Sequence, residues 1–245
     1  MRVVGVPVAG GSALVDLQVG HGEDPAILFK REGFFVRRLL SVKGRSPDIT
    51  VTAQVEHRRD WASRLPALLR RKPAADDVAE TDDPAPERRQ RLAAYVIALS
   101  SRGLLATQFS ERTVVPGLWG LPGGGVQPGE TAAEAVLREL REETGQAIEL
   151  QRILDLQSDH WIGSSPDNVP EDFHALRLIY VAETPEPTDP VVTDVGGTTA
   201  AAQWVPVNRW RQVRWSVGFR AILARHLDVI VKARTLALKR PPALT

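Results

Sequence analysis

Short apolar stretches alternate with polar and glycine-rich ones along the chain, and their spacing predicts the secondary structure. Near the start, runs rich in Val, Ile and Phe predict β-strands. These runs span residues 2–8, 26–29, 34–42 and 49–55. Residues 61–71 fit a short helix less well, because Pro66 interrupts the pattern. A small β-rich domain, a dimerising arm and an over-called gene start all remain open for this region.

The clearest break in the pattern falls at residues 73–90. This stretch holds three prolines, and Val78 is its one large apolar residue. Acidic side chains stand at positions 76, 77, 80, 82 and 83. Such a composition buries too little apolar surface to order itself. We therefore divide the chain into a β-rich region at 1–72, a linker at 73–90 and a main domain at 91–245.

The main domain mixes strand and helix patterns. Strands are predicted at residues 92–99, 104–109, 147–155, 175–182 and 202–207. The first two form a hairpin. Helical spacing covers about 131–144 and about 216–234, where apolar residues recur on one face. Strands on both sides of a helix, without repeated βαβ units, predict a mixed sheet in an α/β sandwich.

Composition narrows the classes of function. The 245 residues carry 31 basic and 30 acidic side chains, a net charge of +1, so global charge indicates no polyanionic partner. The chain has no cysteine, which excludes disulfides, a thiolate zinc site and a cysteine nucleophile. No apolar run reaches the ~20 residues of a membrane helix, and no signal-peptide pattern is present. We expect a cytoplasmic protein without a membrane partner.

The tail from Arg209 to the end is basic, with nine basic residues and the acidic Asp228. A nucleic-acid surface is one interpretation. The solvated side of an amphipathic helix is the other, and we favour it because Arg220, Arg225 and Lys232 stand beside the apolar face. We therefore expect no nucleic-acid partner.

The predicted helix at 131–144 has clear ends. Thr131 and Glu134 form a capping-box pattern at its start. Gly145 stands where a left-handed glycine ends a helix. Before the helix, the run Gly123–Gly125 lets the backbone approach a ligand closely.

Three carboxylates gather on one side of this helix. Glu139, Glu142 and Glu143 stand at i, i+3 and i+4, and each like-charged pair costs roughly 0.2–0.5 kcal/mol. A divalent cation would remove the repulsion. All-oxygen ligation favours Mg²⁺, with Mn²⁺ as a second choice. Arg138 precedes Glu142 by four residues and can pair with it.

The spacing of these residues resembles the Nudix box, Gx5Ex7REUxEExGU, in which U is a large apolar residue. Reading from Gly124, the chain has Glu130 after five residues and the run Arg138 to Gly145 after seven more. One position departs, because Gln146 stands where the last apolar residue belongs. We expect Ala147 or Ile148 to supply that packing.

The resemblance implies a Nudix-type α/β/α sandwich that performs Mg²⁺-dependent hydrolysis of a nucleoside diphosphate linked to another group. Carried over by position, the metal ligands are Glu139, Glu142, Glu143 and the carbonyl of Gly123. Glu130 and Arg138 orient them. The carboxylates taken as catalytic are Glu139, Glu143 and Glu171. The general base is left open between Glu139 and Glu171, which is read as a loop acid.

Substrate contacts are predicted around the box. The candidates are Gln108, Phe109, Arg112, Trp119 and His174. Trp119 could stack on a base, although core packing fits it better, and His174 fits a structural role better.

A MutT-type nucleoside triphosphate hydrolase is slightly favoured. The alternatives are a nucleoside diphosphate-sugar or ADP-ribose-type pyrophosphatase, a non-catalytic nucleotide sensor and an RNA-end hydrolase. The expected partner is a soluble nucleotide, and a homodimer is left open.

Overall fold

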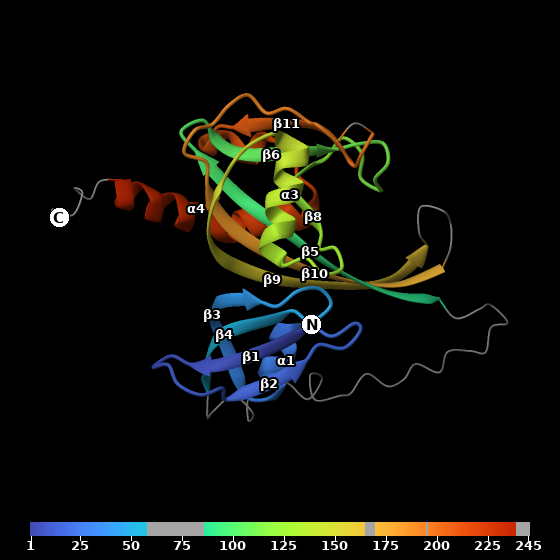
Figure 1. Ribbon diagram of the computed structural model, residues 1–245, viewed down its shortest axis with the longest axis vertical. Coiled ribbons are helices and arrows are strands. Elements are labelled where there is room, and N and C mark those ends of the chain that lie inside the picture. Colours follow the sequence, from blue (N-terminus) through green and yellow to red (C-terminus); the bar gives the residue numbers. More distant parts are fainter. Residues whose placement is uncertain (58–85, 165–169, 195, 239–245) are drawn as a thin grey trace.

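The structure is a computed structural model that describes residues 1–57, 86–164, 170–194 and 196–238. Two β-sheets lie one above the other, with the first part of the chain below the second in Figure 1. The predicted helix at 61–71 and most of the predicted linker at 73–90 fall outside the described residues.

The N-terminal sheet contains four strands in the order β2-β1-β4-β3. They are β1 (Arg2–Pro7), β2 (Val15–Gln18), β3 (Phe34–Lys43) and β4 (Thr50–His57). Helix α1 (Pro25–Arg31) occupies the place of the strand predicted at 26–29, so that prediction was wrong. Asp24 caps the helix by accepting from the Ala26 N–H at 2.7 Å, and Pro25 suits the first turn. These local signals outweigh the β-propensity of Ile27 and Phe29.

The larger sheet contains seven strands in the order β11-β6-β5-β10-β9, with β7 added to β6 and β8 to β5. They are β5 (Glu87–Ser100), β6 (Gly103–Phe109), β7 (Trp119–Gly120), β8 (Gly123–Gly125), β9 (Glu149–Ser164), β10 (Pro170–Glu183) and β11 (Thr199–Val205). Strands β5 and β10 run parallel, and the other pairs in this sheet run antiparallel. The predicted mixed sheet is confirmed.

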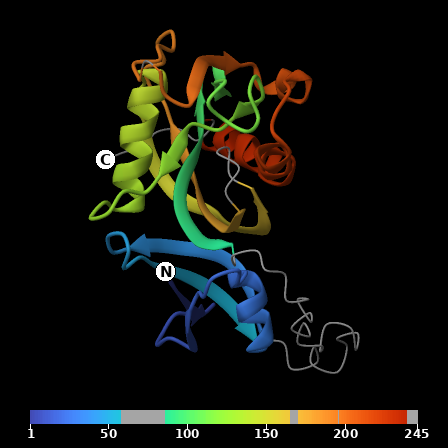
Figure 2. The same cartoon turned by 90° about the vertical axis from the view of Figure 1, so that its right-hand side faces the viewer.

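Helices cover the two faces of the larger sheet. Helix α3 (Ala132–Thr144) lies on one face, and α4 (Val217–Leu238) lies on the other after the 3-10 turn η1 (Val207–Gln212) (Figure 2). Val136 and Leu140 of α3 enter one buried cluster, which also reaches the N-terminal sheet through Val51. Ile222 and Leu223 of α4 enter the other. The predicted α/β/α sandwich with an additional N-terminal β region is therefore confirmed.

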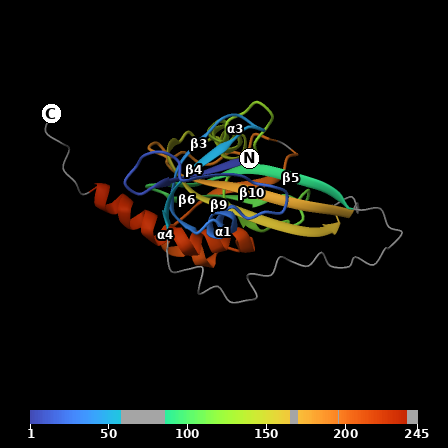
Figure 3. The same cartoon turned by 90° about the horizontal axis from the view of Figure 1, so that it is seen from below.

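The long strands extend beyond their apolar segments. Strand β5 begins at Glu87, inside the predicted linker, and β10 begins at Pro170 rather than 175. Their polar ends pair with each other from Glu87 and Glu171 onward. These ends are strands because of backbone hydrogen bonds between β5 and β10 rather than burial of their side chains. Figure 3 shows β5, β10 and β9 side by side over this extension. Among the described residues, no helix has the length and apolar character needed to cross a membrane.

Candidate active site

Helix α3 is fixed at both ends, so its acidic side chains occupy defined positions. Thr131 accepts from the Glu134 N–H at 3.1 Å, and Glu134 accepts from the Thr131 N–H at 2.9 Å. Gly145 ends the helix in the left-handed region at φ 66°. With Val136 and Leu140 buried against the sheet, the acidic face of the helix lies toward β8.

The glycines of β8 allow a carboxylate to lie directly over the backbone. Gly124 pairs with Ala94 of β5. A Cβ atom at Gly124 would lie 2.5 Å from the carboxyl carbon of Glu139. A Cβ at Gly125 would lie 3.1 Å from the guanidinium of Arg91. Because glycine has no side chain, Glu139 and Arg91 can each approach the backbone of this short strand.

Glu143 is the most buried carboxylate of the cluster, with 8% of its surface exposed. One oxygen accepts from the Gly123 N–H at 2.9 Å, and the other accepts from the Thr199 hydroxyl at 2.5 Å. Burial raises the pKa of Glu143 to about 7, repulsion from Glu139 adds to this, and the two hydrogen bonds oppose it. The site therefore contains a buried acid whose negative charge is incompletely compensated.

Arg138 forms hydrogen bonds with three other carboxylates at or near the helix. Its guanidinium donates to Glu130 at 2.9 Å, to Glu139 at 2.8 Å and to Glu142 at 3.3 Å. It also donates to the Gly125 carbonyl at 3.1 Å. The hydrogen bond from Arg138 holds the pKa of Glu130 below its ordinary value. A single guanidinium thus fixes three carboxylates but neutralises only one unit of their charge.

These donors suit a hard divalent cation. Glu139, Glu142 and Glu143 offer carboxylate oxygens on one side of α3, and the carbonyl of Gly123 belongs to the adjacent β8. The acids outnumber the bases that contact them, and burial raises the pKa of Glu143 in spite of its two hydrogen bonds. All-oxygen ligands of this kind fit Mg²⁺ better than zinc.

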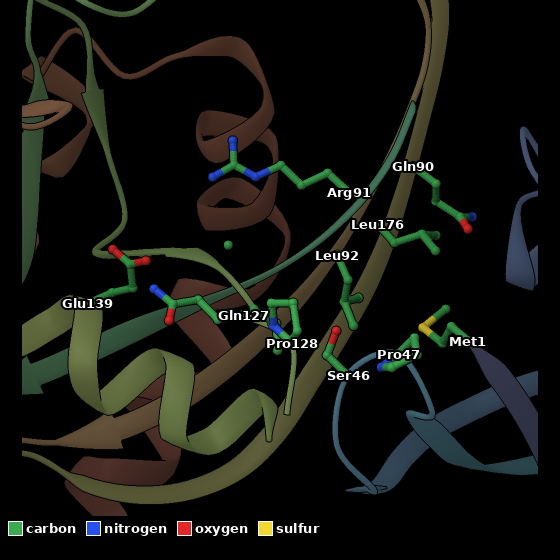
Figure 4. Close-up of a pocket in the computed structure, with 12 residues that line it drawn as sticks. Met1, Ser46, Pro47, Gln90, Arg91, Leu92, Gln127, Pro128, Glu139 and Leu176 are labelled. Atoms are coloured by element: carbon green, nitrogen blue, oxygen red, sulfur yellow. The ribbon is translucent and has the colours of Figure 1, made fainter. Parts of the chain in front are cut away.

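A cavity of about 510 Å³ opens beside Glu139, within the usual size range for small-ligand pockets. Arg91, Gln127 and Glu139 line it on the side of the larger sheet (Figure 4). Ser46 and Pro47 line it from the N-terminal sheet. Sequence reasoning missed Arg91, Ser46 and Pro47, because nothing in their local pattern marks them.

The loop containing Ser46 is attached to the α3 segment by specific contacts. The Ser46 N–H donates to the Glu130 carbonyl at 2.9 Å, and the Gly129 N–H donates to the Ser46 carbonyl at 2.8 Å. Arg45 donates to Glu134 at 2.8 and 3.0 Å. Residues 1–57 therefore form part of the wall around the carboxylate cluster.

The predicted substrate residues upstream of the box line a second cavity of about 420 Å³. Gln108, Phe109 and Arg112 lie there, together with Ala200 of β11. Ala200 follows Thr199, the hydroxyl partner of Glu143. Thr199 is a further residue that sequence reasoning missed, because its contact spans 56 positions of the chain. This cavity therefore reaches the residue of β11 that follows the hydroxyl partner of Glu143.

The structure does not bring Glu171 to the carboxylate cluster. Glu171 lies in strand β10 rather than in a loop, and it pairs with Arg89 at 2.6 Å. Its position is seven residues from Leu178, the β10 partner of Ala94, or about 23 Å along the strand. The interpretation of Glu171 as a loop acid near the site was wrong.

Two further residues have structural surroundings. His174 is fully buried in the middle of β10, and its ring contacts Gln90 and Ser158 at 2.8 Å each. Trp119 is half-buried and packs against the core beside α4. Neither residue lines the cavity beside Glu139.

Gln146 explains the departure in the box. It is buried and exchanges two hydrogen bonds with Thr188: the Gln146 amide donates at 2.8 Å, and its carbonyl accepts at 3.0 Å. Its polar groups are thus satisfied inside the protein. Ile148 packs against the core two positions later.

Comparison with known proteins gives the following similarities. Residues 89–224 match the family model described as the NUDIX domain. The nucleoside triphosphatase NudI of Enterobacter sp. (strain 638) is 34% identical over 95 residues, which is 38% of this chain and 67% of that protein. NudI of Escherichia fergusonii is 38% identical over 79 residues, covering 31% of this chain and 56% of that protein. The aligned part of the chain thus spans about half to two thirds of these relatives.

Two solved structures are also similar to this chain. The MutT protein from Methanosarcina mazei Go1 has a TM-score of 0.44 at 20% identity, covering 58% of this chain and 95% of that one. The NUDIX domain of Shewanella oneidensis NrtR, solved with ADP ribose, has a TM-score of 0.44 at 17% identity. The similarity covers 63% of this chain and 94% of that one.

Proposed function

Because the chain belongs to the Nudix family, and is therefore a hydrolase, we propose that it hydrolyses nucleoside triphosphates to a nucleoside monophosphate and pyrophosphate. The observation that carries this proposal is the carboxylate cluster of α3 beside a cavity large enough for a nucleotide. The similarity to nucleoside triphosphatases named NudI supports a triphosphate substrate.

We propose Glu139, Glu142 and Glu143, with the Gly123 carbonyl, as the residues that hold Mg²⁺. When bound, the ion would neutralise phosphate oxygens and lower the pKa of a bound water. Arg138 positions Glu139 and Glu142 through its hydrogen bonds. The Thr199 hydroxyl and the Gly123 N–H orient the carboxylate of Glu143. Each ligand is thus held by a defined partner before substrate arrives.

Glu139 is the proposed general base. It is the box carboxylate that lines the cavity, so it can reach a water molecule placed there. Arg91 lines the same cavity and is suited to a phosphate oxygen. Met1, Leu92 and Pro47 add apolar surface farther from the carboxylates, which suits the base or sugar of the substrate.

We propose that residues 1–57 act as a separate unit that completes the substrate pocket. The support is that Ser46 and Pro47 line the cavity while Ser46 is bonded to the carbonyl of Glu130. The sequence interpretations of this region as a dimerising arm or surplus chain have no comparable support. The proposal predicts that the region affects substrate choice and, through the contact of Ser46 with Glu130, the orientation of the catalytic carboxylates.

The test is a panel of nucleoside triphosphates, nucleoside diphosphate sugars and ADP-ribose with Mg²⁺, with products identified by ion-exchange chromatography. We expect monophosphate and pyrophosphate from one or more triphosphates. Glu139→Gln should lower kcat by about 10²–10⁴-fold. Glu186→Gln, at an exposed position outside the cluster, is the matched control and should retain activity.

Three results would contradict parts of this proposal. Turnover confined to diphosphate sugars or ADP-ribose would refute the triphosphate assignment. Tight binding of a nucleotide without turnover of any compound would indicate a sensor. Unchanged kcat in Glu139→Gln would refute the assignment of Glu139 as general base.

A further inference from the structure

Two histidines and an aspartate converge where the N-terminal sheet meets the ends of β9 and β10. His21 Nε2 lies 2.9 Å from Asp172 Oδ1, and His160 Nε2 lies 2.6 Å from the same oxygen. The three candidate ligand atoms all lie within 4.8 Å of one another. His21 comes from the turn after β2, while the other two come from the larger sheet. The cluster therefore joins two parts of the chain.

Strand pairing and one glycine explain why these side chains meet. His160 lies opposite His174 in the β9–β10 ladder, and Asp172 is two residues from His174, so all three share a face of the sheet. Gly22 has φ +73°, and a Cβ there would lie 3.1 Å from Cε1 of His160. Only glycine lets this turn rest on the imidazole and place His21 beside Asp172.

The turn is further fixed by His174. The Gly22 N–H donates to His174 Nδ1 at 3.0 Å, and Gln90 Nε2 contacts the same nitrogen at 2.8 Å. Because both are donors, Nδ1 is the acceptor, and Nε2 carries the proton that faces Ser158. Both ring nitrogens of His174 are thus occupied. It positions the turn and is not itself a free ligand.

Hydrogen bonding alone leaves this cluster incomplete. His21 Nε2 is shielded from solvent, yet no group of the described residues completes a hydrogen bond to it with acceptable geometry, despite the short distance to Asp172. His160 already directs its Nε2 to the same oxygen. A buried imidazole nitrogen without a well-formed hydrogen bond is unfavourable. A ligand that accepts its lone pair would satisfy it.

We infer that His21, His160 and Asp172 bind one divalent transition-metal ion of the Zn²⁺ or Co²⁺ class. Two imidazole nitrogens and one carboxylate oxygen suit such ions. Bond lengths of about 2.0–2.1 Å in a tetrahedron place ligand atoms about 3.3 Å apart. The separations of 2.9 and 2.6 Å are shorter than this value and the third is at most 4.8 Å, so small shifts of the side chains would form the site. Arg88 lies 3.6 Å from the second oxygen of Asp172, which favours binding through a single oxygen.

This site is independent of the carboxylate cluster of α3. Asp172 is six residues along β10 from Leu178, which pairs with Ala94 beside Gly124, or about 20 Å. The ligand chemistry also differs, because imidazoles favour Zn²⁺ or Co²⁺ and carboxylates favour Mg²⁺. The ion would fasten residues 1–57 to the larger sheet rather than take part in hydrolysis.

The experiment is titration of the metal-free full-length chain with Co²⁺ in excess Mg²⁺, which occupies the carboxylate cluster. We expect one Co²⁺ per chain, with visible absorption bands of low-coordinate cobalt. His21→Ala and His160→Ala should each weaken Co²⁺ affinity by more than about 100-fold. Loss of a residue that only hydrogen-bonds to a metal ligand typically weakens affinity by about 10–100-fold. His57→Ala is the matched control, since His57 is exposed in the N-terminal sheet and outside the cluster.

Two further measurements begin from the wild-type chain. X-ray absorption of the Zn²⁺-loaded wild type in Mg²⁺ should show two imidazole ligands. Zn²⁺ at 100 times its Kd should raise the Tm by about 5–10 °C, and His21→Ala should lose that increase. Absence of stoichiometric Co²⁺ binding, absence of imidazole ligation, or equal weakening by His57→Ala would overturn the inference. None of these outcomes depends on nucleotide turnover.

Discussion

Replacing Glu143 by Gln should stabilise the metal-free protein at alkaline pH. The pKa of Glu143 is raised to about 7 from the ordinary 4.5, chiefly by burial. The folded state therefore binds this proton more tightly than the unfolded state, so stability falls as pH rises through this window. With 1.36 kcal/mol per pKa unit, ionised Glu143 costs the folded state about 3 kcal/mol above pH 7. Below about pH 4.5 this cost is absent.

Glutamine fits the position because it can keep both contacts. Its carbonyl can accept from the Gly123 N–H, and its amide can donate to the Thr199 hydroxyl, which also accepts hydrogen bonds. The variant thus removes the buried charge without leaving an unpaired polar group. We expect Glu143→Gln to exceed the wild type by up to about 3 kcal/mol at pH 8, with little difference near pH 4.5.

Urea unfolding in the presence of a chelator at pH 5, 7 and 8 measures this difference. Adding Mn²⁺ at pH 8 should stabilise the wild type but barely affect Glu143→Gln, because the ion needs the carboxylate. Glu142→Gln is the control: its side chain is 44% exposed, so solvent already screens its charge and little pH-dependent gain is expected. A difference between wild type and Glu143→Gln that does not change with pH would refute the reasoning.

Three further predictions concern the surroundings of the cluster. Thr199→Val removes a hydrogen bond to ionised Glu143 and should weaken Mn²⁺ binding roughly 10-fold at pH 7, as calorimetry would show; unchanged affinity would contradict this role. Gly124→Ala places a Cβ 2.5 Å from the Glu139 carboxyl carbon and should lower kcat at least ~10-fold while the fold, followed by circular dichroism, persists. Arg45→Ala loses an exposed ion pair with Glu134 and should raise KM more than it lowers kcat; an effect on kcat alone would contradict a role in the pocket wall.

The α3 segment could be predicted from sequence because its signals are local. Thr131, Glu134 and Gly145 encode the helix ends within a few residues, and the spacing of Glu139, Glu142 and Glu143 places them on one side. The same approach failed at residues 26–29, where apolar side chains suggested a strand. There the Asp24 cap and Pro25 favoured a helix. Local capping chemistry was the better guide in both cases.

The other parts of the site depend on contacts between distant segments. Thr199 meets Glu143 across 56 positions, and Ser46 meets Glu130 across 84 positions (130 − 46). The polar ends of β5 and β10 become strands through mutual pairing, which placed Glu171 in a ladder instead of a loop. The hydrophobic periodicity of one segment does not identify its distant contacts, because each segment alone could pack against other parts of the chain.

The hydrogen bond from Ser46 to Glu130 connects the N-terminal region physically to the proposed catalytic residues. The Ser46 N–H holds the main chain of Glu130, and the side chain of Glu130 holds Arg138 at 2.9 Å. Arg138 in turn fixes Glu139 at 2.8 Å. A shift of the Ser46 loop would therefore change both the pocket wall and the orientation of the proposed base. For this reason, we expect substrate choice and catalytic geometry to be coupled through Glu130, with residues outside the box contributing to both.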